Sequence, residues 1–406
     1  MPATHAGGLR VLLLAPQPFF IERGTPIAVR AAAETLARAG HSIDLLVYHL
    51  GDDVELPENV TLRRMPAVPG VQAMRPGPSL AKLACLFRFH GEAFRLARRR
   101  GYDLVHAVED GVFVAMRLRA KLGLPFVYDM DSLMSEQVAA KPVVGGPAGA
   151  VFASLERRAV RTAEHCLCVC PHLRDIAARD APEDRLTVLT DFPLVDPAPA
   201  TAEVAERVGR AHADGRLVAA YVGNLEPYQG VWDMLEAVRL LGGAASAVRL
   251  HIYGGPDDIA GAMRERYDDL VRQGSVEFCG SIAVARLGEV LSSADVLLSP
   301  RKVGTNTPMK LYGYLASGKP VLATSILSHT QVLGAEHAEL VEPRPDALAE
   351  GLRRLAEDPA RRKAVGAAGA ALVEARHSRA AFTRILTGVY GQLAERLLSG
   401  RASNGN

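Results

Sequence analysis

The sequence contains two successive series of short apolar runs, and helix-length segments separate the runs in each series. The first series comprises LRVLLLAPQ (residues 9–17), SIDLLVYH, YDLVHAV, PFVYDMD and CLCVC. The second comprises RLVAAYVGN (residues 216–224), VRLHIYGG, VEFCG, ADVLLSP and PVLATS. A strand that is buried on both faces of a parallel sheet has such a run. Alternation with helices therefore predicts an α/β protein with two doubly wound sheets, one in each half of the chain.

A stretch rich in Pro and Ala, residues 195–201 (VDPAPAT), separates the two series. Such composition is typical of an interdomain linker. We therefore predict a first domain over residues 1–195 and a second over residues 196–378. The end of the chain has a mostly helical pattern, and we expect residues 379–398 to form a helix that packs back on the first domain. Residues 399–406 are expected to be a disordered tail.

Composition excludes several classes of protein. Lys and Arg number 47 and Asp and Glu 45, so no global field favours nucleic acid as a partner. No apolar run reaches the roughly 18 residues of a membrane span, and the N-terminus lacks the pattern of a secretory signal. A cytoplasmic protein is expected. No strand-to-helix loop reads GxGxxG with a following acidic residue, so a dinucleotide dehydrogenase has little support.

Three cysteines alternate in HCLCVC, namely Cys166, Cys168 and Cys170. Alternation puts them on one face of a strand. Their spacing contains no CxxC pair, and neighbouring thiols on one strand do not match the usual zinc geometry. A buried strand is predicted.

Residues 299–325 (SPRKVGTNTPMKLYGYLASGKPVLATS) carry the strongest chemical pattern. A strand leads into a loop, Thr307 is suited to be an N-cap, and Pro308 suits the first helical position. Unpaired amides and the dipole make a helix N-terminus an anion site. The residues that would join them are Arg301, Lys302, Thr305, Asn306 and Lys310. The pattern suits a diphosphate, while a capped helix with solvated basic neighbours is the alternative.

This stretch, read as PxKLYxYLASGKPV, resembles the donor-site helix of the family-4 retaining glycosyltransferases. YVGNLEPYQGVWDMLEA resembles the first strand, loop and helix of their nucleotide domain, and HIYGG the second glycine turn. RGTPIAVRAAAETLARAGHSIDLL, DLVHAVED and VYDMDS resemble their acceptor domain. The similarity covers most of residues 9–395. It implies the GT-B fold, in which two doubly wound Rossmann-like domains face each other and a C-terminal helix returns to the first domain.

The resemblance also implies an activity. A hexose-type sugar would move from a nucleotide diphosphate sugar, UDP- or GDP-linked, to a hydroxyl of a glycan, lipid-linked or small-molecule acceptor, with retention and with no further cofactor and no metal. The donor would bind in the cleft between the domains. The implied donor residues are Gly223, Asn224, Gln229, Gly254, Ser281, Ile282, Arg301, Thr305, Asn306, Thr307 and Lys310.

The sequence departs from the family pattern at four positions of the donor site. Many members have two glutamates where this chain has Thr305 and Gly313, and an arginine and a lysine where it has Asn224 and Gln229. The diphosphate charge would therefore be met by the remaining cations and the helix end. We expect a divergent branch in which Asn224 and Gln229 donate neutral hydrogen bonds. An inactive homologue is the alternative.

Acceptor-side candidates lie at the ends of strands in the first domain. Gly24 and Thr25 belong to the first β-α loop, which can approach phosphate or acceptor closely, and His106 lies at the end of a later strand. The catalytic histidine of the family does not transfer to a matching position. Glu109 and Asp131 are the candidates for orienting or deprotonating the acceptor hydroxyl. Either one would otherwise cap the following helix.

The DMD of residues 129–131 also fits a pair of metal ligands, as in the GT-A glycosyltransferases. The phosphate pattern lies in the other half of the chain, however, so no metal is expected. Two alternative functions remain for the whole chain: a GT-B-shaped nucleotide-sugar epimerase and a non-catalytic nucleotide-sugar-binding protein.

Residues 79–101 (SLAKLACLFRFHGEAFRLARRRG) combine a broad apolar face with cationic edges. As a helix, this segment is compatible with peripheral contact at the inner, anionic surface of a membrane and with a lipid-linked acceptor. A helix facing the core with an Arg-rich solvent end is the alternative.

Overall fold

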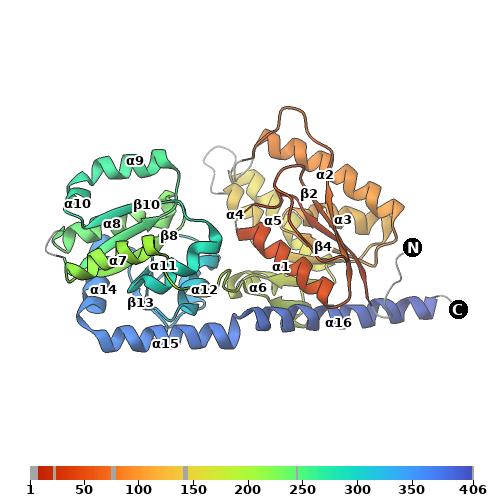
Figure 1. Cartoon of the computed structure of the whole chain (residues 1–406). Coiled ribbons are helices and arrows are strands. Elements are labelled where there is room, and N and C mark those ends of the chain that lie inside the picture. Colours follow the sequence, from red (N-terminus) through yellow and green to blue (C-terminus); the bar gives the residue numbers. More distant parts are fainter. Residues whose placement is uncertain (1–7, 22–23, 75–78, 140–144, 244–245, 405–406) are drawn as a thin grey trace. The chain divides into compact units, whose positions relative to one another are not determined.

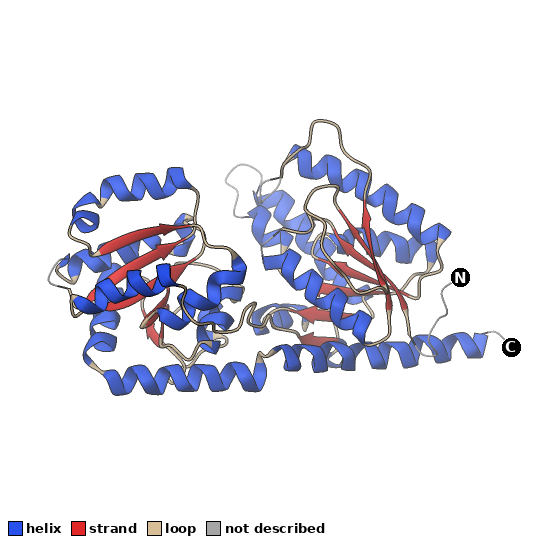
Figure 2. Cartoon of the chain, in the orientation of Figure 1, coloured by secondary structure: helices blue, strands red, loops and turns tan. Residues whose placement is uncertain are grey.

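The structure is a computed structural model, and it describes residues 8–21, 24–74, 79–139, 145–243 and 246–404 (Figure 1). The chain divides into two compact units, residues 1–190 with 382–406, and residues 191–381. Each unit has one sheet with helices on both faces (Figure 2). The two doubly wound sheets that the sequence predicts are therefore confirmed.

The sheet of the first unit has seven strands in the order β3-β2-β1-β4-β5-β6-β7, all paired in parallel. The strands are β1 (Arg10–Ala15), β2 (Ser42–Val47), β3 (Val60–Arg64), β4 (Leu104–Val108), β5 (Phe126–Met130), β6 (His165–Cys168) and β7 (Leu186–Val188). The helices are α1 (Gly24–Arg38), α2 (Leu80–Arg99), α3 (Gly111–Leu122), α4 (Met134–Ala139), α5 (Gly145–Thr162), α6 (Pro171–Ala177) and α16 (Arg379–Asn404).

Alternation of side chains along the strands gives this sheet two buried faces. Helices α2, α3, α5 and α6 cover one face and pack against Val105 and Ala107 of β4. On the opposite face, the ring of His106 contacts Tyr390 of α16. The C-terminal helix thus completes the core of the first unit, as the resemblance implies.

The sheet of the second unit has six parallel strands in the order β10-β9-β8-β11-β12-β13. They are β8 (Leu217–Val222), β9 (Val248–Tyr253), β10 (Val276–Gly280), β11 (Val296–Ser299), β12 (Val321–Thr324) and β13 (Glu339–Val341). The helices are α7 (Ala202–Ala213), α8 (Val231–Leu240), α9 (Asp257–Arg266), α10 (Asp268–Arg272), α11 (Leu287–Ser293), α12 (Met309–Ala316), α13 (Leu327–Thr330), α14 (Pro345–Glu357) and α15 (Pro359–Arg376), with 3-10 turns at η2 (Pro227–Gln229) and η4 (Val284–Arg286). A further 3-10 turn, η1 (Glu183–Arg185), precedes β7 in the first unit.

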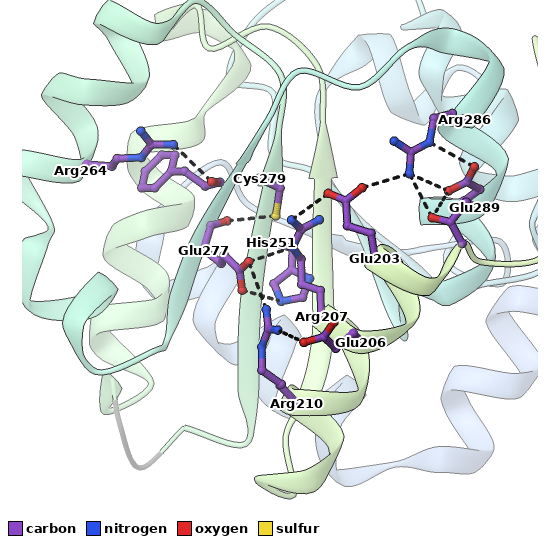
Figure 3. Close-up of polar contacts among 12 residues, drawn as sticks. Glu203, Glu206, Arg207, Arg210, His251, Arg264, Glu277, Cys279, Arg286 and Glu289 are labelled. Atoms are coloured by element: carbon purple, nitrogen blue, oxygen red, sulfur yellow. Dashed lines mark hydrogen bonds and ion pairs between the residues drawn. The ribbon is translucent and has the colours of Figure 1, made fainter.

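An ion cluster holds α7 against this sheet (Figure 3). Arg207 of α7 donates from Nε to Glu277 Oε1 at 2.8 Å. Beneath them His251 is fully buried, and neither of its ring nitrogens has a hydrogen-bond partner among the described residues. Glu277 Oε2 lies 3.9 Å from His251 Nε2. Burial lowers the pKa of His251 to about 4, so this imidazole is neutral at physiological pH.

The predicted linker is part of the second unit. Ala198 N donates to Gly288 O at 3.3 Å, and Thr201 Oγ1 donates to Glu289 Oε2 at 2.8 Å. A Cβ atom on Gly288 would lie 2.3 Å from the carbonyl oxygen of Asp196. Residues 195–201 therefore lack regular structure but lie directly against α11, and the boundary between the units falls at residue 190.

The expectation of a disordered tail from residue 399 is wrong for residues 399–404, because α16 continues to Asn404. Gly400 disfavours a helix by only about 1 kcal/mol, and no proline follows to stop it. Residues 405–406 lie outside the described residues. Cys166 and Cys168 lie in the buried strand β6, as predicted, whereas Cys170 is buried just beyond the strand, at the N-cap of α6.

Candidate functional site

Each sheet reverses its strand order at one place, between β1 and β4 in the first unit and between β8 and β11 in the second. Ligands of open α/β sheets bind beyond the carboxyl ends of the strands at this reversal. The loops that follow β4, β8 and β11 hold most of the candidate residues. The topology thus selects these loops independently of any motif.

The loop after β11 wraps around the side chain of Arg301. Arg301 donates from Nε to Val303 O at 2.9 Å and from Nη1 to Asn306 O at 3.0 Å. Gly304 has φ +142°, and a Cβ there would lie 2.6 Å from the guanidinium. Burial lowers the pKa of Arg301, although an arginine stays charged. Arg301 is therefore fixed in place, and no carboxylate pairs with it among the described residues.

Lys310 lies in the first turn of α12 and is partly buried. Its Nζ is 3.4 Å from Gln229 Oε1 and 4.0 Å from the centroid of the Tyr221 ring. Burial, and secondarily the charge of Arg301, lowers the pKa of Lys310 to about 7. No ion pair of Lys310 occurs within the described part of the chain. The Lys310 ammonium is therefore partly deprotonated near neutral pH, and a bound anion would favour its protonated form.

The N-terminus of α12 differs from the prediction by one residue. The N-cap is Pro308, not Thr307, and no side chain caps the helix. Thr307 is buried, and its hydroxyl accepts a hydrogen bond from Gln331 Nε2 at 3.0 Å. Gln331 Nε2 also donates to Thr305 O at 2.8 Å. The two threonines are held by this amide, and the cap is left to a ligand or to water.

Two glycines pack against each other after β8 and β9, and one of them lies beside Lys310. Gly223, after β8, has φ +154°, and a Cβ there would lie 3.1 Å from Lys310 Nζ and 3.1 Å from the hydroxyl of Tyr221. Gly254, after β9, has φ +105°, and its Cβ would lie 2.4 Å from the carbonyl oxygen of Gly223. A side chain at position 223 would therefore crowd the lysine, and one at position 254 would clash with the backbone of Gly223.

The remaining donor candidates of the second unit also lie in loops beyond the carboxyl ends of its strands. Asn224 is exposed, and its Oδ1 accepts from Glu226 N at 3.4 Å. Gln229 is buried, and its amide oxygen faces Lys310. Ser281 is exposed and Ile282 half-buried just after β10. Lys302, a predicted phosphate contact, instead pairs with Asp233 at 2.8 Å, so its charge is already compensated.

In the first unit, Glu109 lies at the strand reversal, just beyond the carboxyl end of β4. It follows β4 with φ +45°, a strained conformation for a residue other than glycine. Its Oε1 accepts from the Ser132 hydroxyl at 2.7 Å. Burial raises the pKa of Glu109, and the carboxylates of Asp110 and Asp129 raise it further, against the opposing effects of Ser132 and Lys82. A raised pKa makes this carboxylate a stronger base.

Neighbouring acidic residues have defined partners. Asp110 pairs with Lys82 of α2 at 2.7 Å. Asp129 Oδ2 lies 3.0 Å from His106 Nε2. Asp131 is half-buried in the bend after β5, beside Ser132 in the sequence. Within the described ranges, no group of three or more His, Cys, Asp or Glu side chains is arranged to hold a metal ion.

The placement of His106 among the acceptor and phosphate residues is wrong. The side chain is fully buried within β4, and its Nδ1 lies 2.7 Å from the hydroxyl of Tyr390. It alternates with Val105 and Ala107 and therefore faces the core covered by α16. His106 can position Asp129 but cannot contact a substrate directly.

Gly24 and Thr25 form the first turn of α1, where Gly24 is exposed. A Cβ on Gly24 would meet no atom within 4 Å, so the protein itself does not require glycine there. The absence of a side chain leaves room in front of this helix N-terminus. Residues 22–23, which precede it in the loop, lie outside the described residues.

The sequence-based prediction missed several residues of these sites. Tyr221 lies under Lys310, Ser132 bonds to Glu109, and Lys82 pairs with Asp110. Tyr221 occupies an inward position of an apolar strand, where it is indistinguishable from a core residue. Lys82 belongs to a helix far from Asp110 in sequence, and no local pattern indicates their contact.

Two Rossmann-like units, with a cation-lined helix N-terminus at the strand reversal of the second, match the architecture of the GT-B class. Residues 216–358 match the family described as "Glycosyl transferases group 1", and residues 23–191 match the "Glycosyl transferase 4-like domain". The chain therefore belongs to the GT-B glycosyltransferases of the family-4 type.

Individual relatives agree with this assignment. The D-inositol 3-phosphate glycosyltransferase of Kineococcus radiotolerans is 28% identical over 390 residues, covering 86% of this chain and 85% of that protein. Sucrose-phosphate synthase from Thermosynechococcus elongatus has a similar structure, with a TM-score of 0.75 and 21% identity over 95% of this chain and 99% of that one. HepE from Anabaena, solved in complex with UDP, has a TM-score of 0.70 and 15% identity over 96% of this chain and 100% of that one.

Among the described helices, none combines the length and the apolar character needed to cross a bilayer.

Proposed function

We propose that the second unit binds a nucleotide diphosphate sugar, UDP- or GDP-linked, and that the enzyme transfers its hexose with retention to a hydroxyl of a glycan, lipid-linked or small-molecule acceptor. The observation that carries the proposal is the pair of Arg301 and Lys310 at the N-terminus of α12. Both are cationic groups removed from bulk water, and neither has a carboxylate partner among the described residues. Keeping both groups charged side by side is costly without a counterion, so an anion would complete the arrangement.

A diphosphate suits this place better than a single carboxylate. The α12 amides, the guanidinium and the ammonium offer donors from three directions, and Gly223 keeps the space beside Lys310 open. HepE of Anabaena, which shares the fold, was solved with UDP and with UDP-glucose. This supports a nucleotide diphosphate donor for the present chain.

During transfer, the bond between the anomeric carbon and the diphosphate oxygen breaks, and negative charge develops on the departing diphosphate. Lys310, Arg301 and the helix end would stabilise that charge, which lowers the barrier. The acceptor oxygen bonds to the anomeric carbon, and its proton passes to the departing diphosphate. Glu109, strained and held by Ser132, would orient the acceptor hydroxyl, with Asp131 as a second candidate for this role.

The experiment uses isotopically labelled UDP-glucose and GDP-mannose with the purified chain. Slow release of free sugar, with the anomeric configuration retained, is expected from a transferase that lacks its acceptor. Conversion to another nucleotide sugar would show an epimerase. Saturable binding without turnover would show a non-catalytic sensor. Lys310→Met should abolish the release, and absence of any binding to either nucleotide sugar would refute the proposal.

A further inference from the structure

An exposed apolar surface of the first unit lies on α2, α3 and α5. These helices border a groove of about 800 Å³, lined chiefly by apolar side chains that include Leu83, Phe87, Phe113 and Leu155. Leu83 and Phe87 of α2 are 51% and 72% exposed, and Leu155 of α5 is 37% exposed. Large apolar side chains gathered in this way mark an interaction site.

The same three helices are strongly basic. Five Lys or Arg residues lie in α2, three in α3 and three in α5, against only two glutamates, Glu92 and Glu156. Glu92 is bound by Arg95, and Glu156 is buried and bound by Ser135. Lys82, Arg119 and Arg161 pair with carboxylates of other elements, but the three helices still carry more positive than negative charge in a chain whose formal net charge is +2.

Three of these cations line the groove itself, Arg117 and Arg119 of α3 and Arg158 of α5. The guanidinium groups of Arg117 and Arg158 have no hydrogen bond or ion pair with the part of the chain that the structure describes. Arg119, also at the groove, is different because it pairs with Glu164 at 2.5 Å. Cations without partners beside an apolar groove fit a ligand that joins a hydrocarbon chain to a negative headgroup.

We propose that the face formed by α2, α3 and α5 docks on a bilayer of anionic phospholipid. Leu83, Phe87 and Leu155 enter the boundary between headgroups and acyl chains, and the groove takes one hydrocarbon chain. Arg117 and Arg158 bind phosphate groups. Apolar side chains flanked by cations are the pattern of helices that lie in a membrane interface.

A second copy of the chain is a poorer occupant. A two-fold dimer would place the same surface against itself, and both faces would carry the excess positive charge. Like charges brought together in this way are unfavourable. An anionic partner removes the repulsion, and the apolar groove suits a lipid chain.

The test is co-sedimentation of the full chain with vesicles of phosphatidylglycerol or of phosphatidylcholine. Binding to phosphatidylglycerol alone is expected, and it should weaken as salt is added. Leu83→Ser combined with Phe87→Ser should lower the partition coefficient by at least about tenfold. Each of Arg117→Gln and Arg158→Gln should lower it by about fivefold.

The matched control is Leu240→Ser combined with Leu327→Ser. These leucines of the second unit are 53% and 44% exposed, and their replacement should leave vesicle binding unchanged. Equal binding to both lipids would overturn the proposal, as would unchanged binding of the Leu83 and Phe87 variant. So would a dimer, detected by light scattering, that this variant dissociates.

Nucleotide binding is measured on the same samples by thermal shift with UDP. Because the groove belongs to the first unit and Lys310 to the second, the Leu83 and Phe87 variant should keep the UDP-dependent shift. If the variant loses vesicle binding but keeps the UDP-dependent shift, the result bears on the membrane face alone and supports it. If the wild-type chain binds no nucleotide sugar, the proposed transferase function is refuted, and the membrane face is not affected by that result.

Discussion

Replacement of Lys310 by methionine tests the donor site most directly. Methionine keeps the length of the side chain and removes the charge. A charge-assisted hydrogen bond contributes about 1.5–3 kcal/mol, so the dissociation constant for UDP at pH 6 should rise by roughly 10- to 150-fold. The Lys310→Arg variant keeps a positive charge at every pH and serves as the matched control.

The pH dependence of this effect follows from the pKa of Lys310, about 7 in the free protein. A bound diphosphate raises that pKa, so binding takes up a proton wherever the free lysine is neutral. Affinity is therefore fully developed below pH 7 and is lost as pH rises. If the pKa of the bound form lies well above 8, the ratio of wild-type to Lys310→Met affinity falls by about tenfold between pH 6 and pH 8.

Isothermal titration of UDP at pH 6, 7 and 8 measures this ratio. The diphosphate has its own ionisation with a pKa of about 6, and dividing by the Lys310→Met values removes it. The Lys310→Arg variant should show no corresponding fall. A wild-type ratio that stays constant over this range would refute a pKa near 7, and equal affinities at pH 6 would remove Lys310 from the site.

Three further predictions concern single residues. Gly223→Ala should weaken UDP binding by at least tenfold and also lower the melting temperature, because its Cβ would crowd both Lys310 Nζ and the buried Tyr221 hydroxyl at φ +154°; an unchanged dissociation constant would place the ligand elsewhere. Glu109→Gln should lower kcat by about 10²–10⁴-fold, with UDP affinity unchanged, and normal turnover in a labelled-donor assay would remove it from the mechanism. His251 has a pKa of about 4 in the folded protein against 6.5 unfolded, so its contribution to stability is present above pH 6.5 and is lost as pH falls toward 4. The loss amounts to about 3 kcal/mol. Urea unfolding at pH 7 and pH 4.5 measures it: the free energy of unfolding should fall less between these pH values for His251→Leu than for the wild type.

The fold could be predicted in outline because its strands are continuous apolar runs. β1, β8 and β11 are buried on both faces, and such strands leave a clear pattern. β3 and β7 were missed because they are short edge strands with mixed polarity, VTLRR and LTV. Edge strands face solvent on one side, so their sequence does not have to be apolar.

The site was predicted less completely than the fold. Arg301 and Lys310 follow from their closeness to one helix start, a feature that is local in sequence. The partners of Lys302 and His106 are instead Asp233 and Tyr390, which the fold brings from other elements. A local pattern can propose a cation or an imidazole, but tertiary contacts decide whether its charge and hydrogen bonds are already used.

The absence of the two family glutamates also changes the charge of the donor site. A carboxylate at the position of Thr305 or Gly313 would lie in the same loop and helix as Arg301 and Lys310, and it would compensate part of their charge. Without it, and with Asn224 and Gln229 neutral, the site depends on one arginine, one titrating lysine and the amides of α12. Because Lys310 becomes fully charged only when an anion arrives, the empty site avoids the repulsion between two buried cations. The negative charge of a donor with two phosphates balances the positive charge of Arg301 and Lys310. Because binding of the diphosphate is coupled to protonation of Lys310, release of the product becomes easier as pH rises.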